Sequence, residues 1–370
     1  MSLDAPDLPD VEVAEHQEVQ LLDPHGRYDA ASPWSPELSD DTLRDMYRWM
    51  VLTRRVDREM INLQRQGQLG VYPSCLGQEG AQIGAAFALG EQDWVFPQYR
   101  ELGLSLYLGV PQAASAHLWR GTWGLGYDPH EFRFAPISIP IGTQALHATG
   151  FALGARLDGR PLATVACVGD GATSTGDVHA AMTFAAVMRA PTVFFIQNNR
   201  YAISVPLEKQ TAAPTLAHKA IGYGMPGWRC DGNDVIATYA VVHHALERAR
   251  AGEGPALVEA MTYRMEAHTT SDDPTRYRSE EELDEARLTD PILRLRRLLE
   301  SRSALDEQQV EQVDQEAERM AAEVRAGIYD APHGDPTEIF DHVYVDATGR
   351  FEQQRAQLQA ELAGTEQEQR

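Results

Sequence analysis

Three short apolar runs stand out along the chain, at positions 163–168, 192–196 and 257–261. Each is rich in Val, Ile, Phe or Ala and spans only five or six residues, which is typical of strands rather than helices. None alternates strictly between apolar and polar positions, and a continuous apolar run is typical of a strand that is covered on both faces. The pattern therefore predicts the interior strands of a parallel sheet.

Helical patterns separate these runs. Between positions 177 and 190, Val178, Met182 and Ala185 recur at helical spacing, and Pro191 ends the pattern just before the second run. Another helix is predicted after Asp234, a residue suited to capping a helix N-terminus. Strands that alternate with helices predict an α/β fold in which helices cover both faces of a parallel sheet.

The two ends of the chain have a different character. Positions 1–40 are rich in proline and lack periodicity, which predicts an extended N-terminal arm, and the α/β domain is assigned to positions 41–285. Positions 286–370 are predicted to form helices that pack on the same domain or at a subunit interface. Long charged helices are expected over 280–302 and 306–326, the first opened by a capping box of Ser279 and Glu282, and a polar helix is expected after Phe351.

Composition narrows the range of functions. The chain has 370 residues, 43% of them hydrophobic, enough for one large domain with extensions, and a net charge of -23. That charge argues against nucleic acids and anionic membranes as partners. Three scattered cysteines, no apolar run long enough for a membrane span and an acidic start predict a cytoplasmic protein. An anionic ligand would therefore need positive charge supplied locally.

Candidate chemistry begins directly after the first predicted strand, at Gly169, Asp170, Gly171 and Ala172. Glycines at a turn between a strand and a helix allow backbone amides to approach a phosphate group, and a helix N-terminus adds partial positive charge. A carboxylate at such a turn would repel phosphate unless a divalent cation lay between them. Asp170 therefore predicts Mg²⁺, which prefers oxygen ligands.

A second group of polar residues follows the next predicted strand. Asn198 and Asn199 come just after the run 192–196, and 27 positions separate Gly171 from Asn198 (198 − 171), room for one crossover helix. Neighbouring parallel strands bring their carboxyl ends to the same edge of a sheet. Although Gly-Asp-Gly alone is most often an ordinary turn, the complete series of strand, turn, helix, strand and Asn-Asn favours a diphosphate and magnesium site.

With these motifs the chain resembles the thiamine-diphosphate enzymes, and most closely the alpha chains of the decarboxylating first component of branched-chain 2-oxo acid dehydrogenase complexes. The resemblance runs from about Met46 into the C-terminal region, and it implies a thiamine-diphosphate-binding fold. It is carried by the Gly-Asp-Gly and Asn-Asn motifs and by further segments at 77–80, 93–101, 176–180, 198–204 and 268–273.

The resemblance also implies roles for individual residues. Asp170, Asn199 and the backbone carbonyl of Tyr201 would hold Mg²⁺. Tyr99, Arg100 and His268 would reach the diphosphate, and each residue type is chemically suited to that contact. His268 would in addition donate a proton as the acyl group passes to a lipoyl group, which makes it the catalytic candidate.

Two further segments carry expectations from the same resemblance. Ile141 would make an apolar contact with the cofactor, while Ser138, Thr143 and Gln144 are possible ligands of K⁺. The polar stretch 264–278 would be a loop ordered over the cofactor, or alternatively a well-capped surface loop. Animal relatives carry a phosphorylated serine just after the histidine of this loop, where the present chain has Thr269, so the sequence leaves phosphorylation of Thr269 or Ser271 open.

The partners implied by the resemblance explain why one chain is not sufficient. A beta chain would supply the activating glutamate and the other half of the cofactor site in a two-alpha, two-beta assembly, and a lipoyl acyltransferase would receive the acyl group. A pyruvate-specific enzyme shares every motif named here and remains an alternative, although the Ser-Asp-Asp and Tyr-Ala-Ile-Ser segments favour branched substrates. A non-catalytic module that binds magnesium and phosphate, and a purely structural subunit, are the alternatives of other classes.

Overall fold

The computed structural model describes residues 17–121, 126–330, 335–341, 343–346 and 348–368. Its centre is a five-stranded parallel sheet in the order β1-β2-β3-β7-β6. The five strands are β1 (Trp94–Phe96), β2 (Thr164–Gly169), β3 (Thr192–Asn198), β6 (Gly227–Asp231) and β7 (Ala256–Met261). A separate antiparallel pair consists of β4 (Tyr201–Ala202) and β5 (Val205–Pro206).

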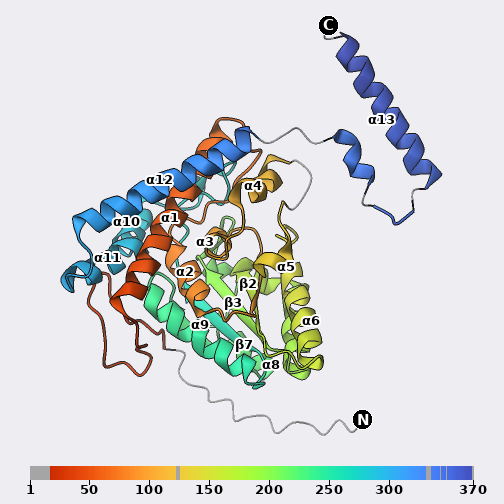
Figure 1. Ribbon diagram of the computed structural model, residues 1–370. Coiled ribbons are helices and arrows are strands. Elements are labelled where there is room, and N and C mark those ends of the chain that lie inside the picture. The colour runs from red at the N-terminus through yellow and green to blue at the C-terminus, as the bar shows by residue number, and fades with distance from the viewer. Residues whose placement is uncertain (1–16, 122–125, 331–334, 342, 347, 369–370) are drawn as a thin grey trace, which may run out of the picture.

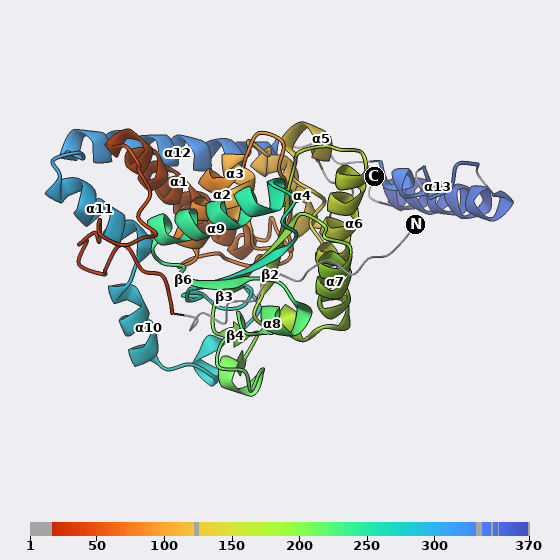
Figure 2. The same ribbon diagram turned by 90° about the horizontal axis from the view of Figure 1, so that it is seen from below.

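Helices cover both faces of the sheet (Figures 1 and 2). Alternate residues of each strand point to opposite faces, so Val165 and Cys167 of β2 belong to one apolar cluster and Ala166 and Val168 to the other. The helices up to residue 250 are α1 (Asp40–Arg65), α2 (Glu79–Ala88), α3 (Leu102–Tyr107), α4 (Gln112–Arg120), α5 (Pro129–Phe132), α6 (Thr143–Leu157), α7 (Gly176–Val187), α8 (Lys219–Tyr223) and α9 (Val235–Arg250). Helices α1, α2 and α9 contribute to the first cluster, and α6, α7 and α8 to the second.

The predicted interior strands are confirmed as β2, β3 and β7, and the helix between the first two is α7. Asp234 caps α9 as predicted, because its carboxylate accepts hydrogen bonds from the backbone amides of Ile236 and Ala237. The sequence patterns did not predict β1 or β6, which are short or only partly buried.

The N-terminal arm is described from residue 17 onward, and positions 1–16 lie outside the described residues. The described part is extended but well packed: Leu21 and Leu22 are fully buried, and their backbone amides donate to the carboxylate of Asp234. Val19 forms an isolated parallel bridge with Cys230 of β6, which is an edge strand of the sheet. Asp234 therefore anchors the arm and the start of α9 together.

The charged stretch after residue 279 differs from the prediction. Instead of one helix over 280–302, the chain forms α10 and α11, because Asp290 caps a new helix whose first residue is Pro291. Ser279 caps α10, but Glu282 accepts a hydrogen bond from the Tyr201 hydroxyl instead of closing a capping box. Helix α10 also crosses the predicted domain boundary at residue 285. The elements of this region are α10 (Glu280–Leu288), α11 (Pro291–Ser301), α12 (Glu307–Tyr329) and α13 (Gly349–Glu368).

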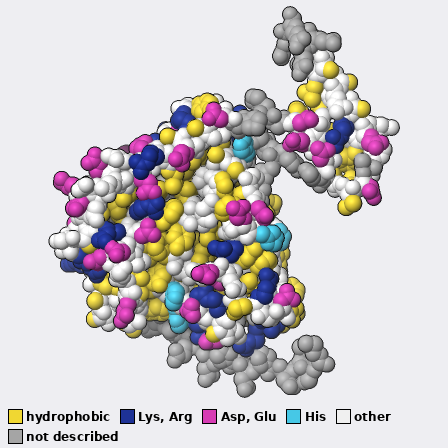
Figure 3. All heavy atoms as spheres, in the orientation of Figure 1, with side chains coloured by type: hydrophobic (Ala, Val, Ile, Leu, Met, Phe, Trp, Pro, Cys, Tyr) yellow, Lys and Arg dark blue, Asp and Glu magenta, His cyan; other side chains and the backbone are white. Residues whose placement is uncertain are grey.

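The surface of the molecule is mixed in charge. On the face seen in Figure 3, acidic and basic side chains are interspersed around apolar areas. Among the helices in the described part of the chain, none combines the length and the apolar character needed to cross a membrane. The described residues also form four short 3-10 helices: η1 (Gly171–Ser174), η2 (Leu207–Lys209), η3 (Pro274–Arg276) and η4 (Pro336–Phe340).

Candidate active site

A cavity of about 490 Å³ opens at the carboxyl edge of the parallel sheet. The segments that follow β1, β2, β3 and β7 all contribute to it, since parallel strands place their carboxyl ends side by side. The predicted cofactor and magnesium residues all line this cavity: Tyr99, Arg100, Ile141, Gly169, Asp170, Gly171, Ala172, Asn199, Tyr201 and His268. Except for Ile141, which precedes α6, these residues are brought together by the order of the strands.

Asp170 lies at the end of β2 and is only 2% exposed. Burial raises the pKa of its carboxyl group, and a hydrogen bond from the Gln210 side chain opposes that shift. Gln210 donates to Oδ2 at 2.6 Å, and no side-chain hydrogen bond to Oδ1 is present among the described residues. A buried carboxylate that lines a cavity is suited to a cation.

Asn199 and Tyr201 supply the other two candidate oxygen ligands. The side-chain Oδ1 of Asn199 accepts a long hydrogen bond of 3.4 Å from the backbone amide of Tyr201. The carbonyl oxygen of Tyr201 accepts from Nη1 of Arg264 at 3.2 Å, which leaves it a second lone pair. No cluster of three His, Cys, Asp or Glu side chains suited to a metal exists in the described ranges, so a metal here would rely on one carboxylate, one amide and one carbonyl.

The predicted turn after β2 contains a short helix. The structure places the short 3-10 helix η1 between Asp170 and α7, because the amide of Thr173 bonds to the carbonyl of Asp170 and that of Thr175 to the carbonyl of Ala172. A side chain on Gly171 would collide with Ala202, its Cβ lying 2.5 Å from the Cβ of that residue. Glycine is therefore required where the turn approaches β4.

Two buried arginines give the cavity positive charge. Arg100 is 5% exposed and Arg264 is 1% exposed, and neither takes part in an ion pair within the described residues. Arg100 donates to the carbonyl oxygens of Ser74 and His268, and Arg264 donates to those of Tyr201 and Ile203. Because buried arginines are normally paired with carboxylates, two that meet only neutral oxygens indicate a binding site for an anion.

His268 lies beside these arginines and close to Tyr99. Its Nε2 is 3.4 Å from the Tyr99 hydroxyl oxygen, and its backbone amide donates to Asp272 at 2.9 Å. Burial, followed by the charges of Arg100 and Arg264, lowers the pKa of His268 to about 4. The imidazole is therefore neutral at pH 7 and offers one donor and one acceptor nitrogen.

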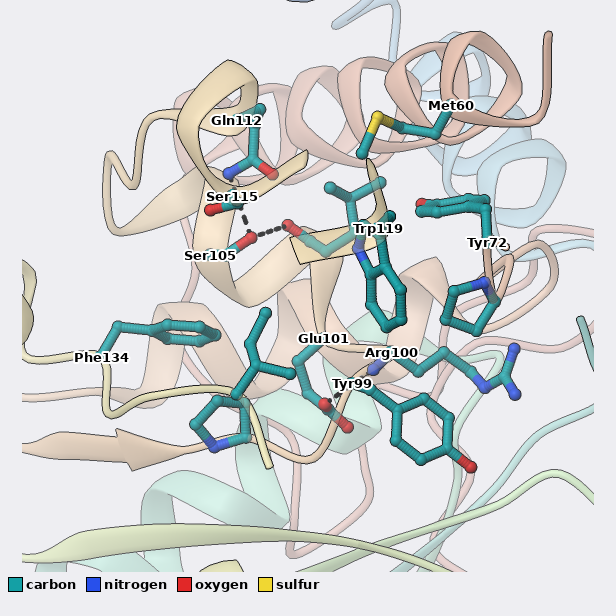
Figure 4. A pocket seen from close by; sticks show the side chains of 14 residues that line it. Met60, Tyr72, Tyr99, Arg100, Glu101, Ser105, Gln112, Ser115, Trp119 and Phe134 are labelled. Carbon is teal, nitrogen blue, oxygen red and sulfur yellow. Dashed lines mark hydrogen bonds between the residues drawn. The ribbon is translucent and has the colours of Figure 1, made fainter. Parts of the chain in front are cut away.

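Tyr99, Arg100 and Trp119 also line a second, much smaller cavity of about 30 Å³ (Figure 4). Figure 4 shows Tyr99 and Arg100 extending to one side while Trp119 stands above them. The adjacent Glu101 points elsewhere and accepts hydrogen bonds from the backbone amides of Gln98 and Arg100 and from the side chain of Gln197. Glu101 thus fixes the backbone from which Tyr99 and Arg100 project.

The three candidate potassium ligands do not line the main cavity. Ser138 donates a 3.3 Å hydrogen bond to the carbonyl oxygen of Pro140, and Thr143 begins α6. Gln144 is buried, donates to the carbonyl oxygen of Cys167, and has a side-chain oxygen without a hydrogen-bond donor among the described residues.

Sequence reasoning missed several residues that line the cavity. Arg264 is the most consequential, because it adds a second buried cation, and Gln98 and Trp119 also contribute to the walls. Arg264 follows β7 by three positions, so a search for basic residues after each predicted strand would have found it. Trp119 lies on α4, and no local pattern connects it with the sheet.

Comparison with known proteins identifies the family of the chain. The family described as "Dehydrogenase E1 component" matches residues 47–336. The chain is 52% identical to the 3-methyl-2-oxobutanoate dehydrogenase subunit alpha of Mycobacterium tuberculosis, over 94% of this chain and 95% of the relative. It is 39% identical to the pyruvate dehydrogenase E1 component subunit alpha of Bacillus cereus (90% and 89% covered) and 38% identical to the 2-oxoisovalerate dehydrogenase subunit alpha of Bacillus subtilis (83% and 96%). The chain therefore belongs to the dehydrogenase E1 component family.

Proposed function

We propose that this chain is the alpha subunit of a thiamine-diphosphate-dependent dehydrogenase that oxidatively decarboxylates a branched-chain 2-oxo acid and passes the acyl group to a lipoyl acyltransferase. The observation that carries the proposal is the pair of buried arginines, Arg100 and Arg264, which form no ion pair within the described residues and line the same cavity as the buried Asp170. A diphosphate with a bound divalent cation satisfies both charges at once.

The residues present fit the cofactor. Asp170, Asn199 and the carbonyl of Tyr201 would hold Mg²⁺, and Tyr99, Arg100 and His268, together with Arg264, would hold the diphosphate. Gly169, Gly171 and Ala172 line the same space, and a side chain on Gly171 would collide with Ala202. Ile141, which is 42% exposed at the cavity, would contact the body of the cofactor.

Bound thiamine diphosphate supplies the chemistry that breaks the bond between the 2-oxo carbon and its carboxylate. His268 would hold the diphosphate and would donate a proton during transfer to the lipoyl group, and its neutral state at pH 7 leaves one N–H available. We also assign K⁺ to Ser138, Thr143 and Gln144, and the support is the buried, unsatisfied side-chain oxygen of Gln144.

The branched-chain substrate is supported by the names of the relatives. The 52% identity to a 3-methyl-2-oxobutanoate dehydrogenase subunit exceeds the 39% identity to a pyruvate dehydrogenase subunit. Because a pyruvate dehydrogenase subunit is also among the relatives, the preference is tested directly by assays with both substrates.

The proposal includes a beta subunit that supplies the activating glutamate in a two-alpha, two-beta assembly. Three apolar side chains at the cavity are unusually exposed, Ile139 at 49%, Ile141 at 42% and Ile203 at 56%, which supports coverage by a second chain. In this assignment residues 41–285 form the cofactor-holding domain, residues 1–40 an arm along it, and residues 286–370 helices on the same domain or at a subunit contact.

The test is to purify the chain with and without a beta chain and to measure thiamine-diphosphate-dependent decarboxylation of pyruvate and of 3-methyl-2-oxobutanoate. The proposal predicts activity only in the assembly, greater with 3-methyl-2-oxobutanoate. Activity of the isolated chain would refute the shared site. A preference for pyruvate would refute the substrate assignment alone.

A further inference from the structure

Gln78 belongs to the Gly77–Gly80 segment, to which the site described so far gives no role. It precedes α2, is 1% exposed and does not line the main cavity. Its side-chain Oε1 accepts a 3.2 Å hydrogen bond from Nδ2 of Asn199, a residue 121 positions away in the chain. Gln78 is thus a buried partner of one proposed magnesium ligand.

This contact has a direct effect on Asn199. A carboxamide has a donor end and an acceptor end, and only the oxygen can bind a cation. Because Gln78 offers an acceptor oxygen, it engages the nitrogen of Asn199 and leaves Oδ1 on the side of the Tyr201 backbone amide. A reversed Asn199 amide would place one oxygen against another at Gln78 and would turn its nitrogen toward the ligand position.

The backbone that carries Gln78 is firmly held on both sides, and among the described residues its side-chain oxygen makes a hydrogen bond while its side-chain nitrogen makes none. Gly77 has φ +89°, and its carbonyl oxygen accepts a 2.8 Å hydrogen bond from the Thr262 hydroxyl just after β7. On the other side, Glu79 accepts from the backbone amide of Gly77 and forms an ion pair with Arg54 at 2.8 Å. The segment is therefore fastened to both the sheet and α1.

We propose that Gln78 is a positioning residue for the metal site, which sets the amide of Asn199 so that its oxygen faces the cation. The inference rests on the proposed magnesium site. Residues that orient metal ligands typically change metal affinity by about 10-fold to 100-fold when they are replaced.

The experiment uses the assembly of this chain with a beta chain and follows the thermal midpoint at a fixed thiamine diphosphate concentration while Mg²⁺ is titrated. Gln78→Met removes the acceptor but keeps a similar length, whereas Gln78→Glu keeps an acceptor oxygen. Gln112→Met is the matched control, because Gln112 is also buried and its side-chain hydrogen bonds to described residues go to Ser105 and Val110. The measured quantity is the Mg²⁺ concentration that gives half of the stabilisation.

We expect this concentration to rise at least about 10-fold in Gln78→Met and to stay within about 3-fold of the unaltered protein in Gln78→Glu and Gln112→Met. An unchanged value in Gln78→Met, or an equal rise in Gln78→Glu, would overturn the inference. Should Gln78→Met not assemble, Gln78→Asn replaces it, since its amide is one methylene too short to reach Asn199. A parent assembly that needs no Mg²⁺ would instead refute the proposed function.

Discussion

Nη2 of Arg100 donates a 3.0 Å hydrogen bond to the backbone carbonyl oxygen of His268. The two residues are 168 positions apart, and the other terminal nitrogen of Arg100 donates to the carbonyl oxygen of Ser74. One guanidinium therefore ties the segment after β1 to the loop that carries His268 and to the segment before α2. The same side chain remains available to an anion, because its present partners are neutral.

Arg100→Lys should weaken thiamine diphosphate binding by at least about 10-fold, because an ammonium group cannot contact two carbonyls and a phosphate with fixed planar geometry. Calorimetric titration of the alpha-beta assembly in the presence of Mg²⁺ measures the effect. Arg55→Lys, in a surface ion pair with Glu318 on α12, is the control and should bind normally. Equal affinity in the two variants would show that Arg100 does not bind the cofactor.

The lowered pKa of His268 predicts a pH dependence of stability in the assembly without cofactor. Its pKa is about 4 in the folded chain and about 6.5 when exposed, so on acidification the unfolded state takes up the proton first. The stability that neutral His268 contributes above pH 6.5 is therefore lost as the pH falls toward 4. His268→Gln should therefore lose less stability than the parent between pH 7 and pH 5. Thermal midpoints at both values test this, with exposed His147→Gln as the control.

Asp57 should be needed for stability although it lies outside the cavity. This fully buried carboxylate accepts hydrogen bonds from the Tyr72 hydroxyl, the Ser74 hydroxyl and the Cys75 amide. In Asp57→Asn, the side-chain NH2 group would face one of these three groups, all of which are hydrogen-bond donors. The free energy of unfolding should therefore fall by about 1–3 kcal/mol. Urea denaturation measures the change. A loss smaller than about 0.5 kcal/mol, the size expected at a surface position, would contradict this account.

Gly77 and Gly67 form a matched pair of left-handed glycines, with φ values of +89° and +75°. A Cβ on Gly77 would lie 2.4 Å from the carbonyl oxygen of Tyr263, whereas a Cβ on Gly67 meets nothing within 4 Å. Gly67→Ala should cost about 1 kcal/mol from backbone strain alone. Gly77→Ala should cost about 3 kcal/mol or more, since the contacted atom is backbone and cannot turn aside. Comparable denaturation midpoints for the two variants would disprove the steric argument.

Part of this structure could be read from local sequence. The interior strands β2, β3 and β7 were predictable because burial on both faces requires continuous apolar runs. The meeting of Asp170 with Asn199 followed from the same pattern, since β2 and β3 are neighbours and end at one edge. Asp234 was recognisable as a cap because capping depends on residues only two or three positions away.

Other features depend on contacts between distant segments. The link from Gln78 to Asn199 spans 121 positions, and neither neighbourhood signals it. Glu282 was expected to close a capping box, but the hydroxyl of Tyr201 competes for its carboxylate in the folded chain. Trp119 reaches the cavity through the packing of α4, which no periodicity in α4 reveals. Such features become visible only when strand order has brought the segments together.

The charges of Arg100 and Arg264 should affect the abundance of the protein in the cell. An anion that enters their cavity replaces missing counter-charges, so it stabilises the folded chain in proportion to the logarithm of its own concentration. Without that anion, two buried like charges share one cavity. The abundance of the subunit should then follow the supply of its small anionic ligand. When the ligand is scarce, more of the chain unfolds and is degraded.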